Sequence, residues 1–245
     1  MTAKITLKDR VAVVTGASSG IGKAIALELA KEGAMLGLVG RNLSNLEATA
    51  LEAKKTSSLV VSYSTDLTID AEIAHLKTRL QADFDNAVDI LVHCAGVYVP
   101  GSLQTANIDD LDLQYRANVR APYLLTQTLL PMVLAQQGQI VFINSSVIMR
   151  PAGNVGQYAA TQHALKAIAD SLREEVNAQE VRVLSIYPGR TATPRQATIH
   201  AMEGKVYKCE NLLQAQDVAI VVVNALNLPR TAEVTDINIR PFQKI

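Results

Sequence analysis

Short apolar runs alternate with longer amphipathic segments along the whole chain of 245 residues, and this alternation limits the fold more than any other feature. Several of the runs are apolar at almost every position, which is typical of strands that are buried on both faces of a sheet. Parallel strands need helical connections, and those connections are right-handed. The pattern therefore predicts an α/β fold, with a doubly wound parallel sheet and helices on both faces.

The expected strands lie at residues 11–15, 35–40, 59–64, 88–93, 140–144, 181–187 and 233–239, and the expected helices at 20–32, 42–55, 69–84, 109–137, 157–178 and 217–226. Because no repeat, low-complexity tract or linker interrupts this series, we expect residues 1–245 to form a single domain. Residues 190–214 have mixed polarity, so they are predicted to be a mobile loop or a set of short helices. They follow the carboxyl end of a strand, where ligand-contacting loops lie in such folds, and are the expected substrate loop.

Charge and cysteine content exclude several classes of protein. Lys and Arg together number 23 and so do Asp and Glu, so the chain has no overall positive field to hold a nucleic acid or an anionic membrane. No apolar stretch approaches the roughly 20 residues that span a bilayer. The two cysteines, Cys94 and Cys209, suffice neither for a disulfide framework nor for a zinc site. We therefore expect a cytoplasmic protein with reduced thiols and no bound metal.

A glycine-rich turn joins the first strand to the first helix, in the sequence Thr15-Gly16-Ala17-Ser18-Ser19-Gly20-Ile21-Gly22. Glycine allows a sharp turn and a close approach to phosphate, and the start of the helix offers free N–H groups with partial positive charge. This strand–turn–helix context predicts a site for the pyrophosphate of a dinucleotide, formed by Gly16, Ser18, Ser19, Gly20, Ile21 and Gly22. The alternative is a glycine-rich turn that binds nothing.

The spacing Thr-Gly-x-x-x-Gly-Ile-Gly resembles that of the short-chain dehydrogenase/reductase family, and the resemblance covers essentially the whole chain. It implies a seven-stranded Rossmann-type sheet, a bound NAD or NADP, and a small carbonyl or alcohol substrate. It also implies a homodimer or homotetramer that packs through two long central helices.

Arg41 favours NADP over NAD. An acidic side chain at the end of the second strand would bond the ribose 2′-hydroxyl and repel a 2′-phosphate. This chain has Gly40-Arg41 there, and a guanidinium binds a phosphate well. The alternative interpretation is that Arg41 is a solvated residue at the start of a helix.

Three other segments match coenzyme-binding segments of the family. Asp66, followed by Leu67, matches its adenine-contacting aspartate, although a turn cap is the alternative role. His93-Cys94-Ala95-Gly96 stands where the family has Asn-Asn-Ala-Gly, so Ala95 and Gly96 are kept while two amide side chains are lost. We expect His93 to be structural and Cys94 to be a small buried apolar residue. The segment that wraps the nicotinamide amide in the family is matched by Pro188, Gly189, Thr191 and Thr193.

A tyrosine and a serine are the candidates for proton transfer. Reduction of a carbonyl requires a proton donor, and a phenol serves if its pKa falls towards neutrality. Tyr158 lies near the start of a predicted helix, 13 residues after Ser145 at the end of a strand. The resemblance implies that Ser145 holds the substrate oxygen, that Tyr158 transfers the proton, and that Asn118 helps to hold a relay water. Ser146 is the alternative match for the serine.

Gln162 is the clear departure from the family. The family has a lysine four residues after the tyrosine, which bonds the nicotinamide ribose and lowers the pKa of the tyrosine. Glutamine still donates hydrogen bonds but has no charge, and a unit charge about 5 Å away is worth roughly 3 kcal/mol at an effective dielectric constant near 20.

Two functions are therefore predicted. One is an NADP-dependent oxidoreductase of reduced activity, and the other is an NADP-binding protein with a sensing or interaction role. A methyltransferase of similar fold is disfavoured, because it would not need Ser145 and Tyr158 at this spacing.

Overall fold

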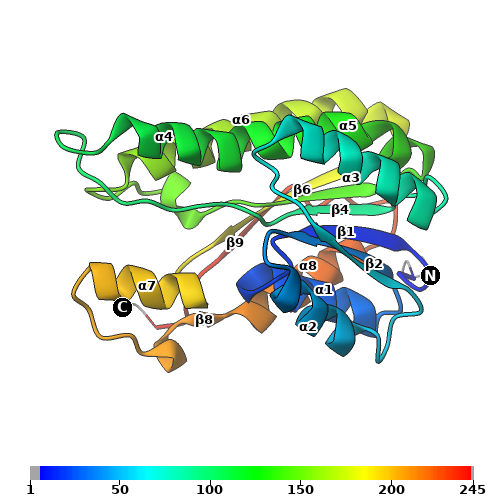
Figure 1. Cartoon of the computed structure of the whole chain (residues 1–245), viewed down its shortest axis with the longest axis horizontal. Coiled ribbons are helices and arrows are strands. Elements are labelled where there is room, and N and C mark those ends of the chain that lie inside the picture. The colour runs from blue at the N-terminus through cyan, green and yellow to red at the C-terminus, as the bar shows by residue number, and fades with distance from the viewer. Residues whose placement is uncertain (1–5, 244–245) are drawn as a thin grey trace.

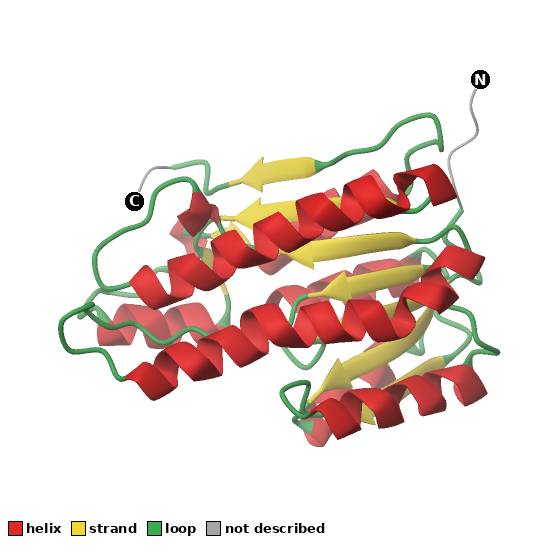
Figure 2. Ribbon diagram, turned by 90° about the horizontal axis from the view of Figure 1, so that it is seen from above, coloured by secondary structure: helices red, strands yellow, loops and turns green. Residues whose placement is uncertain are grey.

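The computed structural model describes residues 6–243 and contains a seven-stranded parallel sheet. The strand order is β3-β2-β1-β4-β5-β6-β9, and the arrows all point the same way in Figure 2. The bounds are β1 Val11–Thr15, β2 Met35–Gly40, β3 Val60–Ser64, β4 Ile90–His93, β5 Gln139–Ile143, β6 Arg182–Pro188 and β9 Asp236–Ile239. The predicted Rossmann-type fold and its seven strands are confirmed.

Helices cover both faces of this sheet (Figure 1). One face carries α1 (Gly20–Lys31), α2 (Leu43–Ala53) and α8 (Ala215–Leu226), and the other carries α3 (Asp70–Asp83), α4 (Ile108–Tyr115), α5 (Ala121–Ala135) and α6 (Gly156–Val176). Strand β1 shows why two layers are needed. Its Ala12 and Val14 side chains belong to the core beneath α1 and α8, while Val11 and Val13 belong to the core beneath α3, α5 and α6.

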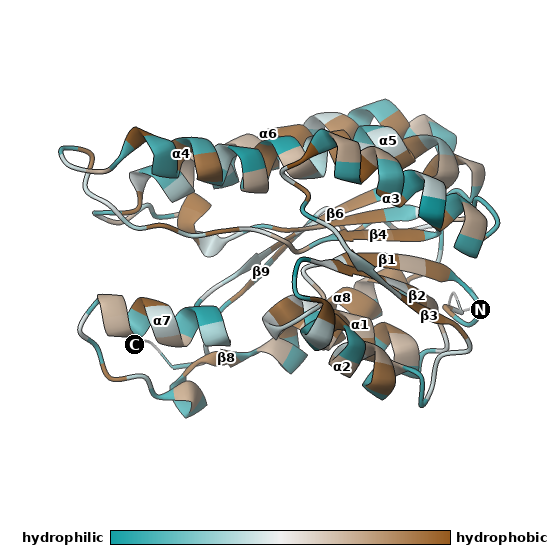
Figure 3. Ribbon diagram, in the orientation of Figure 1, coloured by the Kyte–Doolittle hydropathy of each residue, from teal (hydrophilic) through white to brown (hydrophobic). Residues whose placement is uncertain are grey.

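Hydropathy follows this layered arrangement (Figure 3). The strands are brown along most of their length, while the outer sides of the helices show more teal. Among residues 6–243, no helix combines the length and the apolar character needed to cross a bilayer.

The long helix expected at residues 109–137 departs from a uniform α-helix. It is continuous, but Arg116–Arg120 form a π-helical turn between α4 and α5. Such a turn adds one residue to the helical repeat and is often found at functional sites. The turn lies within one continuous helical segment, so the prediction of a long helix did not reveal it.

The segment at residues 190–214 is a set of short elements, one of the two predicted alternatives. It contains β7 (Thr191–Ala192), α7 (Pro194–Met202), a short 3-10 helix (Cys209–Asn211) and β8 (Leu213–Gln214). Strands β7 and β8 pair with each other in a separate two-stranded sheet. In Figure 1, α7 and β8 lie together at one end of the molecule, apart from the main sheet.

Candidate active site

A large cavity lies where the strand order reverses. From β1 the chain proceeds outward through β2 to β3, and then crosses to β4 on the other side of β1. Such a reversal opens a crevice at the carboxyl ends of the strands. The cavity there has a volume of about 1130 Å³, above the range of roughly 300–1,000 Å³ usual for small-molecule sites.

All the predicted site residues line this one cavity. They are Gly16, Ser18, Ser19, Gly20, Ile21, Gly22, Arg41, Asp66, Leu67, Ala95, Gly96, Asn118, Ser145, Tyr158, Gln162, Pro188, Gly189, Thr191 and Thr193. They come from the ends of six strands and from helices on both faces, so the fold brings together residues up to 177 positions apart. Ser146, the alternative serine, lines the cavity as well.

The first turn of α1 is open to an anion. Ser19 occupies the N-cap position in an extended conformation, and within the described chain no side chain caps this helix start. Backbone contacts explain two of the glycines. A Cβ on Gly22 would lie 2.3 Å from the Gly16 carbonyl oxygen, and one on Gly16 would lie 2.9 Å from the Ala95 nitrogen. The turn is therefore held tightly while its N–H groups remain available for a phosphate.

Arg41 and Asp66 lie at the ends of β2 and β3, two neighbouring strands. Asp66 accepts hydrogen bonds from the Thr68 backbone N–H at 2.9 Å and from its hydroxyl at 2.7 Å. Burial favours the protonated form, but the bonds from Thr68 and the charge of Arg41 outweigh it and lower the pKa of Asp66. Asp66 thus makes the turn contacts of its alternative role while it also lines the cavity.

Hydrogen bonds from its own backbone hold the segment after β4 in place. The Thr15 hydroxyl accepts hydrogen bonds from the backbone N–H groups of Cys94 and Ala95, at 2.9 and 3.1 Å. His93 is buried, bonds the Thr126 hydroxyl at 2.8 Å and stacks on Phe142, contacts that suit a structural role.

The environment of this segment also affects its titratable groups. Burial lowers the pKa of His93 to about 3. Burial raises the pKa of the Cys94 thiol to about 12, against the opposing charge of Arg195. Cys94 has intermediate exposure and forms part of the cavity wall, so the expectation of a buried residue was wrong.

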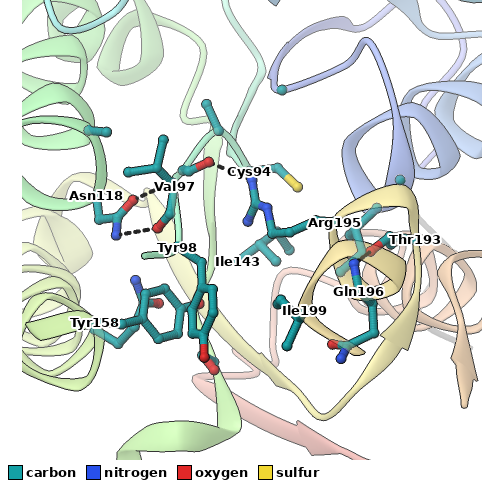
Figure 4. Close-up of a pocket in the computed structure, with 18 of the residues that line it drawn as sticks. Cys94, Val97, Tyr98, Asn118, Ile143, Tyr158, Thr193, Arg195, Gln196 and Ile199 are labelled. Carbon is teal, nitrogen blue, oxygen red and sulfur yellow. Dashed lines mark hydrogen bonds between the residues drawn. The ribbon is translucent and has the colours of Figure 1, made fainter. Parts of the chain in front are cut away.

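Asn118 lies in the π-helical turn and clamps the backbone of the segment after β4. Its Oδ1 accepts from the Val97 N–H at 2.7 Å, and its Nδ2 donates to the Val97 carbonyl at 2.9 Å and to the Thr161 hydroxyl at 3.1 Å. Figure 4 shows the two bonds to Val97. Both Nδ2 hydrogens are therefore used, and the side chain can bind a water only through the second lone pair of Oδ1.

Tyr158 and Ser145 meet at the wall of the cavity. Burial raises the pKa of Tyr158, whereas the charge of Arg195 and a hydrogen bond with Ser145 oppose this shift. Asn144 joins the two elements, because its Nδ2 donates to the Gln162 carbonyl at 3.0 Å and its Oδ1 accepts from the Ser145 N–H at 2.7 Å. Gln162 itself is buried on the same helix as Tyr158 and faces the cavity.

Two further cations, Lys166 on the helix of Tyr158 and Arg190 after β6, have partners of their own. Lys166, two helical turns beyond Tyr158, forms an ion pair with Asp170 at 2.6 Å. Arg190 donates two hydrogen bonds to Glu203, at 2.7 and 2.9 Å. Neither supplies the missing charge at the position of Gln162.

Helix α7 covers one side of the cavity. Thr193 is its N-cap and accepts from the Gln196 N–H at 3.2 Å, and Pro194 is its first residue. The Glu203 carboxylate just after α7 is held by Arg190 and Lys205, and these bonds lower its pKa to about 2.

Two arginines of the cavity wall were not singled out from the sequence. Arg195 reaches from the first turn of α7 across the cavity and donates to the Gly96 carbonyl (Figure 4). Arg150 follows the short helix after β5 and also lines the cavity. Neither position belongs to a motif of the family named above. The sequence shows Arg195 as a cation two residues after Thr193, but it lies in the segment 190–214, for which the sequence predicts either a loop or short helices.

Comparisons with known proteins agree with this geometry. The short chain dehydrogenase family matches residues 10–204. An uncharacterized oxidoreductase of Staphylococcus epidermidis is 34% identical over 236 residues, which cover 96% of this chain and 98% of the relative. A metagenomic short-chain oxidoreductase, solved in complex with NADP, is 30% identical with a TM-score of 0.83, covering 98% of this chain and 100% of that one. The 3-ketoacyl-(acyl-carrier-protein) reductase of Brucella melitensis, solved with NADH, is 26% identical with a TM-score of 0.84, covering 95% and 97%.

Proposed function

Because this chain belongs to the short-chain dehydrogenase family, we propose that it is an NADP-dependent oxidoreductase that interconverts a carbonyl compound and a secondary alcohol. The observation that carries the proposal is the meeting of Ser145 and Tyr158 in the cavity that also receives the open start of α1. A nucleotide phosphate and a reacting carbonyl would then lie in one continuous space.

The residues present fit a dinucleotide. The uncapped N–H groups of α1 suit a diphosphate, and the missing Cβ atoms of Gly16 and Gly22 leave the turn compact. Arg41 lies where a 2′-phosphate would be read, which supports NADP, as does the NADP bound to the metagenomic relative. When bound, the reduced coenzyme supplies a hydride and the oxidised coenzyme accepts one.

Ser145 and Tyr158 have different roles at the substrate oxygen. In reduction, the Ser145 hydroxyl orients the carbonyl oxygen and Tyr158 gives it a proton as the carbonyl carbon gains the hydride. In oxidation, the Tyr158 phenolate removes the proton from the alcohol. Asn118 supports both steps by fixing the Val97 backbone, and its free lone pair accepts from a relay water.

Gln162 favours a slow enzyme, and it is also the reason to keep a second candidate function. Burial of Tyr158 disfavours its phenolate, and Gln162 offers a hydrogen-bond donor but no compensating charge. Reduction begins with the protonated phenol, so the missing charge slows reduction less than it slows oxidation, which begins with the phenolate. The second candidate is an NADP-binding protein with a sensing or interaction role, in which turnover has been lost.

The segment at residues 190–214 is proposed as the substrate cover. Its helix α7 forms one wall of the cavity, which Ile199, Met202 and Glu203 line. The chain is further proposed to act as a homodimer or homotetramer in the cytoplasm.

Turnover of a panel of ketones with NADPH and with NADH separates the two functions, using the wild type, Gln162→Lys and Tyr158→Phe. The oxidoreductase proposal expects slow NADPH oxidation by the wild type, loss of activity in Tyr158→Phe, and a gain of about tenfold or more in Gln162→Lys. A wild type that binds NADPH but turns over no ketone, together with an active Gln162→Lys, supports the sensing role. Equal rates in wild type and Gln162→Lys would contradict the charge argument.

A further inference from the structure

We propose that Arg195 is the cation that supports proton transfer by Tyr158, and that it acts only while α7 lies over the cavity. This inference rests on the proposed function and deepens it. Arg195 is a positioning residue in this scheme, because its charge acts on the phenol through space.

The first observation is where Arg195 reaches. Thr193 caps α7 and Pro194 begins it, so the side chain of Arg195 leaves the first turn of the helix towards the cavity. Its guanidinium donates to the carbonyl of Gly96, in the segment after β4 and 99 positions away in sequence. Figure 4 shows it extended from α7 towards Cys94, in the segment after β4. Arg195 therefore links the cover of the cavity to the segment that faces Tyr158.

The second observation is the set of groups around the phenol. Tyr98, from the segment after β4, packs edge-on against Tyr158 with ring centroids 5.1 Å apart. Ser145 at the end of β5 and Arg195 from α7 both favour the phenolate. Within the described residues, Arg195 is the one cation among the groups that act on Tyr158.

The third observation concerns the helix of Tyr158 itself. Gln162, one turn along, is neutral, and Lys166, two turns along, is paired with Asp170. Arg190, at the end of β6, is occupied by Glu203. A partly buried phenol whose pKa is raised needs a nearby positive charge to lose its proton near neutral pH, and α7 supplies the one that α6 lacks.

The consequence is a proton step tied to the position of α7. During reduction, the substrate carbon takes a hydride from the reduced coenzyme and its oxygen takes the Tyr158 proton. The O–H bond of Tyr158 breaks, leaving a phenolate that solvent later reprotonates, and the product is an alcohol. The guanidinium of Arg195 stabilises that phenolate while the step occurs, and release of α7 withdraws the charge.

The test measures the ionisation of Tyr158 without turnover. A fluorinated tyrosine, whose phenol is more acidic, is placed at position 158 of the full chain, and its 19F chemical shift is followed against pH with saturating NADP. Arg195→Ala is expected to raise the apparent pKa by about one unit. Arg195→Lys is expected to keep the pKa close to its wild-type value. Gln162→Lys, added to Arg195→Ala, is expected to lower the raised pKa again. Arg150→Ala is the matched control, since it removes the same charge from the wall of the same cavity and is expected to leave the titration unchanged.

An unchanged titration in Arg195→Ala would overturn the inference. The pH profile of alcohol oxidation by the unlabelled proteins gives a second measurement: its acidic limb moves to higher pH in Arg195→Ala and returns with Gln162→Lys. A rise in the KM for NADP with an unmoved limb would show that Arg195 merely binds coenzyme. The NMR titration needs no turnover, so the two proposals fail separately. Absence of activity counts against the proposed function, whereas only an unchanged pKa of residue 158 in Arg195→Ala counts against the role of Arg195.

Discussion

The glycines of the first turn are fixed by contacts within the protein as well as by any ligand. A Cβ on Gly22 would meet the carbonyl oxygen of Gly16 at 2.3 Å, a backbone atom that cannot swing aside. The turn would have to open, and the N–H groups of α1 would move with it. The same contact thus serves stability and phosphate binding.

Gly22→Ala is therefore expected to weaken NADPH binding at least tenfold and to lower the free energy of unfolding by about 1–3 kcal/mol. Calorimetric titration and urea unfolding measure the two effects. Gly156→Ala is the matched control, because a Cβ on Gly156 meets nothing within 4 Å. Unchanged coenzyme affinity in Gly22→Ala would show that the turn is not a phosphate site.

Arg41 sets the expected preference between the two coenzymes. A charge-assisted bond to a 2′-phosphate is worth roughly 1.5–3 kcal/mol, and 1.4 kcal/mol corresponds to tenfold in affinity. Arg41→Ala is expected to raise the Kd for NADPH about tenfold or more and to leave the Kd for NADH within twofold. Fluorescence titration with both coenzymes checks this, and NADH serves as the internal control. An equal loss for both would assign Arg41 to the shared part of the nucleotide.

Among the elements, the strands were predictable because burial on both faces leaves a clear apolar run, as in Val11–Thr15. The π-helical turn at Arg116–Arg120 was not, since it changes an otherwise continuous helical segment by one residue. Its effect on the site is nevertheless direct, because it holds Asn118 in reach of Val97. The bounds of helix α7 could not be predicted for another reason. Its buried residues are Gln196 and His200, so the helix lacks an apolar stripe.

The residues of the site also fall into predictable and unpredictable ones. Residues that lie in motifs, such as Tyr158 and Gly22, could be placed at the site from their spacing together with the resemblance to the family. Arg195 could not, because its relation to Tyr158 depends on where α7 lies against the cavity. Contacts between a motif and a covering segment are tertiary, and no local pattern encodes them.

Helix α7 is anchored at its far end by the Glu203 carboxylate, which Arg190 and Lys205 both bind. Glu203→Gln removes the charge while keeping the shape. Exposed ion pairs contribute about 0.2–1 kcal/mol, so amide exchange in α7 is expected to become roughly two- to fivefold faster. Hydrogen–deuterium exchange with peptide resolution measures it, and Glu210→Gln, seven residues further along, is the control. Unaltered exchange in α7 would show that other contacts hold the helix in place.

At the scale of the whole molecule, the buried His93 makes the stability of the sheet depend on pH. Burial lowers its pKa to about 3 in the folded state, against about 6.5 in the unfolded chain. Between these values the unfolded chain binds a proton that the folded protein refuses. The stabilising contribution is therefore complete above about pH 6.5 and decreases as the pH falls towards 3, by about 1.4 kcal/mol per pH unit.

His93→Asn, which introduces the amide typical of the family, tests this dependence. It removes the stacking on Phe142, so the variant is expected to be less stable than the wild type at pH 7. The gap should narrow on acidification, by about 1.4 kcal/mol for each unit below pH 6, because only the wild type must exclude a proton from this position. Urea unfolding of both proteins at pH 7, 6, 5 and 4.5 provides the comparison. Carboxylates elsewhere titrate equally in the two proteins, so their effect cancels in the difference between the two free energies of unfolding. If that difference stays constant with pH, His93 either is protonated in the folded protein or becomes exposed before it binds its proton.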